Sequence, residues 1–249
     1  FLMSASKSSK ASKSSNYIIS ADPNGAQRDG PDFLGKLRSN FVGTQFVLYD
    51  DGLNPKKVIA GSGRQVRVRR EHAAVIYATN VMGTKGPRKM AVHVPKTHPD
   101  GSVEPFQPRT DAFSDPGSLV MQGGENARDN SPGPPSWQPA SSEPAIEQTL
   151  SFSDELCNRP PRWMGGEVGA YVLNFEGRVT MASVKNFQLI RKTDLPAELS
   201  GQKRNNGNVL LQFGRVGKDR FNVDIRYPMT PFQAFGIILS SFDGKMACE

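Results

Sequence analysis

The stretch that decides the fold lies near the C-terminus and reads Tyr227-Pro228-Met229-Thr230-Pro231-Phe232-Gln233-Ala234-Phe235-Gly236-Ile237-Ile238-Leu239-Ser240-Ser241-Phe242-Asp243-Gly244. Thr230 is typical of a helix N-cap, and Pro231 fits the first helical position, where its missing N–H costs nothing. Gly244 predicts the C-terminal stop. The residues between them are apolar on nearly every face, so such a helix must be enclosed by protein or by lipid. About a dozen residues are too few for a bilayer, which needs roughly 20, and the stretch therefore predicts a helix buried in the protein core.

The rest of the chain favours a mainly β protein that encloses this helix. Its 249 residues suffice for one large domain with a well-buried core, and its 24 glycines and 19 prolines suit a turn-rich protein. About nine short strands are expected, separated by regular turn signals. An antiparallel sheet closed into a barrel around the helix would cover it and remove the sheet edges. The alternative is a two-sheet sandwich with a packed helix.

The expected strands are short runs with apolar alternation, bounded by turn residues such as Asp22-Pro23-Asn24-Gly25 and Asp50-Asp51-Gly52. They cover residues 16–20, 33–39, 41–49, two runs within 65–78, 91–94, 169–175, 178–189, 209–216 and 220–225. The chain opens as if in mid-strand at Phe1-Leu2-Met3, and the Ser/Ala/Lys stretch that follows, with Lys7, Lys10 and Lys13, is expected to be a flexible basic segment between two extended pieces. Residues 246–249 are expected to add a last extended piece.

Residues 96–160 differ in composition from the rest of the chain. Most of the 19 prolines lie there among Ser, Gly, Asp and Glu, and few of these residues could join a core. We therefore expect one domain over 1–249 that carries a long Pro/Ser-rich insertion, mostly disordered, at 96–160.

The balance of charge points to an anionic partner. The net charge of +7 suits a nucleic acid, an acidic membrane face or a phosphorylated ligand, and charge alone does not choose among them. Two cysteines, Cys157 and Cys248, make no disulfide framework. No signal peptide or transmembrane segment is recognised, which favours the cytosol or the nucleus.

No catalytic or metal-binding pattern stands out. His72, His93 and His98 have no cysteine or carboxylate at metal-ligand spacing, and no glycine-rich phosphate loop joins a strand to a helix. Asp50-Asp51 is better explained as a turn than as a catalytic pair. Neither enzymatic activity nor a cofactor or metal is expected.

Several blocks of the sequence resemble the Tubby family. They include Asn16-Tyr17-Ile18-Ile19-Ser20, Gly35-Lys36-Leu37-Arg38-Ser39-Asn40-Phe41, Ala73-Ala74-Val75-Ile76-Tyr77, Gly86-Pro87-Arg88-Lys89-Met90, Tyr171-Val172-Leu173-Asn174-Phe175-Glu176-Gly177-Arg178-Val179-Thr180, Gln212-Phe213-Gly214-Arg215-Val216 and Leu239-Ser240-Ser241-Phe242-Asp243. The blocks occur in the family's order and span everything except 97–160. The resemblance implies a twelve-stranded closed barrel threaded by the C-terminal helix. Family members carry further strands before the equivalent of Phe1, so an N-terminal truncation is expected. The insertion and the late blocks are more similar to the plant and protist branch.

The resemblance also implies a function at membranes. Family members bind phosphatidylinositol 4,5-bisphosphate through a cationic pocket at the cytoplasmic face of the plasma membrane, and matching the blocks assigns that pocket to Asn16, Lys36, Arg38 and Arg69. Two adjacent phosphates need several converging donors, and an arginine can chelate phosphate oxygens as a fork. In a strand, the spacing of Lys36 and Arg38 puts both cations on one face. Additional phosphate contacts are assigned more weakly, to Arg67, Arg88 and Lys89.

Other interpretations remain open at this point. All of these cations could be ordinary solvated charges on strands. The basic surface also suits a nucleic-acid-binding transcription regulator in the nucleus, although the sequence has no recognised DNA-reading motif and few aromatics for base stacking. A third hypothesis is an adaptor that senses the lipid and holds protein cargo, or an F-box-type partner, through a region N-terminal to this chain.

Overall fold

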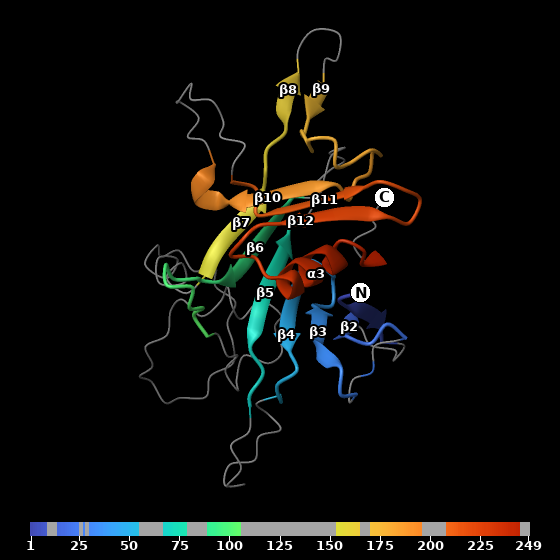
Figure 1. The fold of residues 1–249 in the computed structure, drawn as a ribbon, viewed down its shortest axis with the longest axis vertical. Helices are drawn as coiled ribbons and strands as arrows, with labels where there is room; N and C mark the ends of the chain where they lie inside the picture. The colour runs from blue at the N-terminus through green and yellow to red at the C-terminus, as the bar shows by residue number, and fades with distance from the viewer. Residues whose placement is uncertain are drawn as a thin grey trace, which may run out of the picture.

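The computed structural model describes residues 1–8, 14–24, 27, 30–54, 67–78, 89–105, 153–164, 170–195 and 208–244. Ten described strands form one antiparallel sheet in the order β1-β2-β3-β4-β5-β6-β7-β10-β11-β12, and β8 pairs separately with β9 (Figure 1). The strands are β1 Ser4–Lys7, β2 Asn16–Ser20, β3 Phe33–Ser39, β4 Gln45–Asp50, β5 Glu71–Tyr77, β6 Met90–Pro95, β7 Ser153–Asn158, β8 Arg162–Met164, β9 Ala170–Val172, β10 Phe187–Arg191, β11 Leu211–Arg215 and β12 Phe221–Ile225. A short 3-10 turn, η2, covers Lys192–Asp194, and the helix α3 covers Pro231–Ser240.

The start of α3 confirms the prediction from sequence. Pro231 is the first helical residue, and the Thr230 hydroxyl accepts a hydrogen bond from the Gln233 backbone N–H at 3.2 Å. The Gln233 side-chain oxygen accepts in return from the Thr230 backbone N–H at 2.9 Å, which completes a capping box. These bonds fix the direction in which the chain enters the core.

The end of α3 differs from the prediction. The helix stops at Ser240, four residues before Gly244, and Ser241 is its C-cap. The hydroxyls of Ser240 and Ser241 donate to the carbonyl oxygens of Ile237 and Ile238, at 2.6 Å each. Side chains that satisfy the last carbonyls let the helix end without a glycine.

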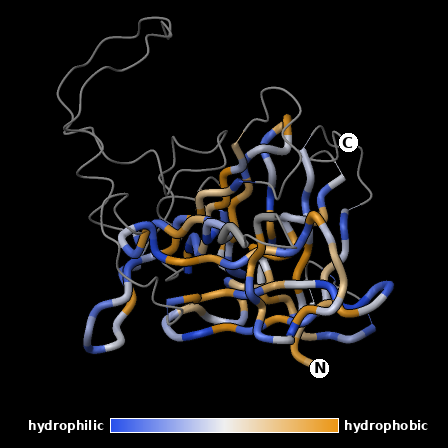
Figure 2. The backbone as a smooth tube through the Cα atoms, turned by 90° about the horizontal axis from the view of Figure 1, so that it is seen from above, coloured by the Kyte–Doolittle hydropathy of each residue, from blue (hydrophilic) through white to orange (hydrophobic). Residues whose placement is uncertain are grey.

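The helix lies in the hollow of the curved sheet and packs on β4 and β5 (Figure 1). Ala234, Ile237 and Ile238 are buried, which confirms that the apolar helix belongs to the core. A Cβ atom on Gly236 would lie 2.8 Å from both methyl carbons of Leu48, so only a glycine allows this close approach to β4. Figure 2 shows hydrophobic and hydrophilic residues alternating along the strands, as expected where one face of a sheet covers a core. Within the described residues, no helix is long and apolar enough to span a bilayer.

Hydrogen bonds between the described strands do not close the sheet into a barrel. β1 and β12 stand at the two ends of the strand order, and no described pairing joins them. The segment after α3 contacts both ends instead. The Tyr17 hydroxyl donates to Asp243 Oδ2 at 2.9 Å and Lys7 Nζ lies 3.7 Å from the same oxygen, while the Phe242 ring packs edge-on against Phe221 at 5.3 Å. The antiparallel architecture with its C-terminal helix is confirmed, and the closed barrel stays a prediction.

Both ends of the range expected to form an insertion are structured. Thr97 and Val103 form an isolated bridge, and β7 pairs with β6 on one side and β10 on the other. β7 contributes Leu156, which is fully buried, but this is the single large aliphatic residue of the strand, so alternation did not reveal it. The expected boundaries 96–160 are therefore too wide, and residues 106–152 lie outside the described residues.

Three other expectations need correction. The segment expected to be flexible contains β1, which pairs with β2 along its whole length. The strand expected over 178–189 is confined to β10, because the Asn186 side chain holds the preceding turn by donating to Met181 O and accepting from the Arg215 backbone N–H, both at 2.9 Å. Residues 67–70 form no strand and contribute only a bridge from Val68 to Leu53. The expected piece at 246–249, with Cys248, lies outside the described residues, as do Lys10 and Lys13.

Candidate functional site

The outer face of the sheet, opposite α3, carries most of the predicted site. Leu37 is buried in the core at 1% exposure, so its neighbours Lys36 and Arg38 point to the other face. The strand register pairs Arg38 with Asn16 on β2 and with Val47 on β4. Because directly paired residues project from the same face of an antiparallel sheet, Asn16 and Arg38 stand side by side.

Lys36 extends this cluster by one step along β3. It pairs with Ile18 and with Tyr49, and its Nζ lies 5.9 Å from the centroid of the Tyr49 ring. Residues two apart on a strand are separated by about 6.8 Å along it. Lys36 and Arg38 are both partly exposed, so two cations face outward together next to the Asn16 amide.

Arg69 adjoins this surface but is buried. It is 2% exposed, and its guanidinium carbon is 4.1 Å from the centroid of the Tyr49 ring, a cation–π contact. Glu71, 1% exposed, is hydrogen-bonded to the Tyr49 hydroxyl. The strand expected over this part of residues 65–78 is therefore wrong, because the chain here is a loop that turns Arg69 inward.

The electrostatics of Tyr49 show how close these groups are. Burial raises the pKa of its hydroxyl, and the negative charge of Glu71 raises it further, while the charges of Arg69 and Arg38 oppose the shift. Charges from three strands or loops therefore act on one hydroxyl. Sequence analysis missed Tyr49 as part of the site, although its alternation with Leu48 places it on the outer face.

Asp50 accepts hydrogen bonds that hold the loop of residues 67–70, which carries Arg69. Its Oδ1 accepts from the backbone N–H groups of Gly52 at 3.0 Å and Arg70 at 2.9 Å. Burial alone would raise the pKa of Asp50, but the His72 imidazole 3.7 Å from its Oδ2, the hydrogen bonds from the backbone and the charge of Arg67 together lower it. An ionised carboxylate thus ties residues 67–70 to the end of β4.

The amide of Asn16 has unused hydrogen-bonding capacity. Its Oδ1 is buried and finds no hydrogen-bond partner among the described residues. Most buried polar atoms in proteins have a partner, so this atom is a candidate contact for a ligand. An amide can accept from a hydroxyl or donate to a phosphate oxygen.

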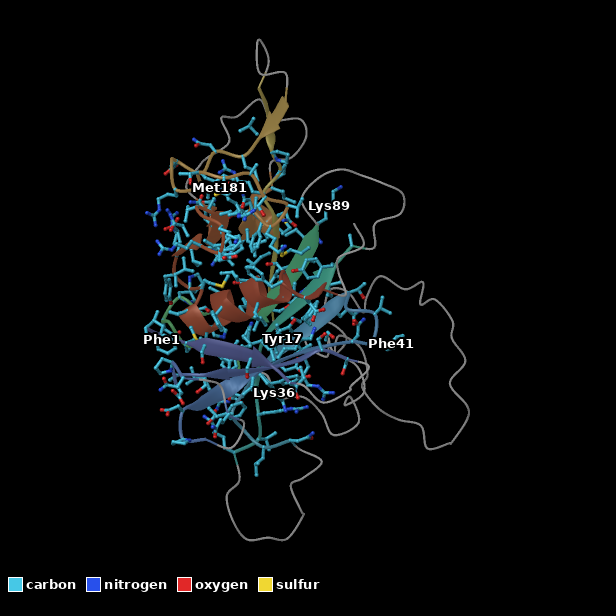
Figure 3. The ribbon with its side chains drawn as sticks, turned by 90° about the vertical axis from the view of Figure 1, so that its right-hand side faces the viewer. Phe1, Tyr17, Lys36, Phe41, Lys89 and Met181 are labelled. Carbon is cyan, nitrogen blue, oxygen red and sulfur yellow. The ribbon has the colours of Figure 1, made fainter. Side chains whose placement is uncertain are left out.

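The weaker candidates do not join the cluster. Arg67 contacts the Asp51 carboxylate and lies 3.8 Å from Asp50 Oδ2, so acidic side chains already hold it. Lys89 precedes β6, and two strands separate it from β3, a gap of roughly 14 Å at about 4.8 Å per strand spacing (Figure 3). Arg88 lies outside the described residues.

Comparisons with known proteins agree with the fold. The Tub family model matches residues 1–244. Tubby-related protein 1 of Mus musculus is 42% identical over 245 residues, which are 98% of this chain and 38% of the relative. Tubby-related protein 3 of Homo sapiens is 41% identical over 249 residues, 100% of this chain and 47% of the relative. Tubby protein homolog 1 of Caenorhabditis elegans is 39% identical over 250 residues, 100% of this chain and 50% of the relative. The chain therefore spans half or less of the length of these animal proteins. Its assignment to a plant or protist branch stays a prediction.

Proposed function

The chain belongs to the Tub family, and on this premise we propose that it binds the headgroup of phosphatidylinositol 4,5-bisphosphate. The observation that carries the proposal is the convergence of Asn16, Lys36 and Arg38 on one outer face of the sheet. Such a site would dock the protein reversibly on the cytoplasmic leaflet of the plasma membrane.

Each residue of the cluster suits a different part of the headgroup. The guanidinium of Arg38 offers two parallel N–H donors to one phosphate, whereas the ammonium of Lys36 is a mobile point charge for the second. Asn16 Oδ1 would accept from a ring hydroxyl. Arg69 is buried, so it contributes positive potential and packs on the Tyr49 ring.

The expected attachment is weak enough to be regulated. A cation near an anionic leaflet adds about 1 kcal/mol, so the few cations of this face give a reversible association. Hydrolysis of the lipid would remove the ligand and release the protein into the cytosol and toward the nucleus. A role as an adaptor for protein cargo is compatible with this cycle and would require a further partner-binding region.

Liposome co-sedimentation tests the proposal. Vesicles with phosphatidylinositol 4,5-bisphosphate are compared with phosphatidylserine vesicles of equal surface charge, using wild type and Lys36→Ala/Arg38→Ala. The matched control is Lys218→Ala/Arg220→Ala, which removes the same two side-chain types, also two residues apart and exposed, from the turn between β11 and β12. We expect selective pelleting of wild type and of the control, and its loss in the site variant. If wild type and the site variant pellet equally on both vesicle types, the protein is attracted only by diffuse positive charge and the headgroup proposal is wrong. Nucleic-acid binding would then be the favoured function.

A further inference from the structure

The loop between β3 and β4 displays two apolar side chains to solvent. Phe41 is 66% exposed and Val42 is 61% exposed, and they are adjacent at the tip of residues 40–44. Scattered exposed apolar residues are common, but an adjacent pair at the tip of a short loop is a feature of surfaces that bind other molecules.

Hydrogen bonds hold this tip in one shape. Asn40 Oδ1 accepts from the backbone N–H groups of Gly43 at 2.8 Å, Thr44 at 3.0 Å and Gln45 at 3.2 Å. Asn40 Nδ2 donates to the Thr44 hydroxyl at 3.0 Å, and Gly43 takes a positive φ of 83° that favours glycine. The apolar pair is therefore presented by a preorganised turn, and binding through it requires little additional ordering.

The tip stands at the same end of the sheet as the headgroup site. Ser39 donates its backbone N–H to Ser15 O at 2.9 Å, and the Ser39 hydroxyl accepts from the Ser15 backbone N–H at 2.8 Å. These bonds join the start of the loop to the residue before Asn16. Arg38 precedes the loop directly, and Figure 3 shows Phe41 at the end of the strands, beyond the body of the sheet.

Building on the proposed function, we propose that Phe41 and Val42 insert into the lipid bilayer while Arg38 and Asn16 hold the headgroup. Apolar side chains gain free energy by leaving water for the acyl region, and aromatic rings are favoured at the membrane interface. A single anchor gives only marginal membrane binding, and stable attachment takes a second signal such as a basic patch. The loop and the cationic cluster supply these two signals at one edge of the molecule, which favours a lipid surface over an uncharged protein partner.

The first test separates the loop from the headgroup site. Phe41→Ser/Val42→Ser is compared with Met181→Ser/Val184→Ser, which removes another exposed apolar pair, 41% and 65% exposed, from a loop beside β11. Binding is measured to vesicles containing phosphatidylinositol 4,5-bisphosphate and, by calorimetry, to soluble inositol 1,4,5-trisphosphate. The loop variant is expected to bind vesicles about tenfold more weakly and the soluble headgroup as wild type does. The control should match wild type in both.

The second test reports depth in the bilayer. In Phe41→Trp, emission should shift to the blue on vesicles and be quenched by lipids brominated along the acyl chain, whereas Val184→Trp should show neither effect. Wild type supplies the background of Trp137 and Trp163. An unquenched Phe41→Trp, or vesicle binding unaffected by the serine variant, would overturn the insertion. If wild type fails to bind the soluble headgroup while Phe41→Trp is still quenched, the headgroup proposal falls and the insertion stands.

Discussion

Replacing Arg69 by alanine is expected to lower the free energy of unfolding by about 3 kcal/mol. The side chain is 2% exposed, with its guanidinium 4.1 Å from the Tyr49 ring, in a cluster that also buries Glu71. A desolvated cation–π contact is worth about 2 kcal/mol. Truncating the buried aliphatic stem of Arg69 adds about 1 kcal/mol, because each buried CH₂ group is worth about 0.8 kcal/mol.

Urea unfolding followed by circular dichroism measures this loss. Arg70→Ala is the matched control, since it removes the same side chain from the next position, which is exposed, and should cost less than about 0.5 kcal/mol. With an m-value of about 2 kcal/mol/M, Arg69→Ala should lower the urea midpoint by roughly 1.5 M. The urea midpoint of Arg69→Lys should lie between those of Arg69→Ala and wild type, because an ammonium keeps the positive charge but cannot stack on the Tyr49 ring as a planar guanidinium does. Equal, small losses in both alanine variants would refute the buried placement of Arg69.

Three further predictions concern stability. Asp50→Asn should lower the free energy of unfolding by about 1–2 kcal/mol at pH 7, because the pKa of Asp50 is lowered in the folded protein and its ionised form therefore stabilises the fold above the ordinary pKa of 3.8. This stabilisation is lost as the pH falls through the pKa of the folded protein. Urea titrations at several pH values should show the stabilities of the variant and wild type converging in acid, and a constant difference would contradict this. Burial, assisted by Lys192 and opposed by Glu155, lowers the pKa of His93, so wild type should lose stability as the pH falls below 6.5 while the unfolded chain takes up the proton. His93→Gln should flatten that dependence, and an unchanged slope would rule out His93 as its source. Thr230→Ala should cost about 1 kcal/mol in thermal unfolding and Thr230→Ser almost nothing, whereas equal effects would show that the capping hydroxyl is unimportant.

Features of the fold that depend on neighbouring residues, such as a helix start or an alternating strand, were predictable from the sequence. Thr230 and Pro231 correctly predicted the start of α3. The strands predicted over 16–20 and 33–39 have the same bounds as β2 and β3 in the structure. The strand β7 was not predictable, because its pairing depends on backbone hydrogen bonds to β6 and β10 and only Leu156 enters the core.

The candidate site divides in the same way. The shared face of Lys36 and Arg38 follows from the two-residue period of a strand, and the register confirms that they share it with Asn16. The burial of Arg69 could not be predicted, since it depends on the bonds from Asp50 to a loop that is distant in sequence and on the Tyr49 ring. A lysine or arginine in a stretch that alternates like a strand can therefore be buried in the folded protein, as Arg69 is.

A crystal structure of the protein with soluble inositol 1,4,5-trisphosphate would show directly where the headgroup binds. We expect the 4- and 5-phosphates on the outer face of the sheet, within hydrogen-bond distance, about 3 Å, of Arg38 and Lys36, with Asn16 hydrogen-bonded to a ring hydroxyl or to a phosphate. Phosphates bound elsewhere, such as at Lys89 or along β10–β12, with the outer face at β3 empty, would contradict it.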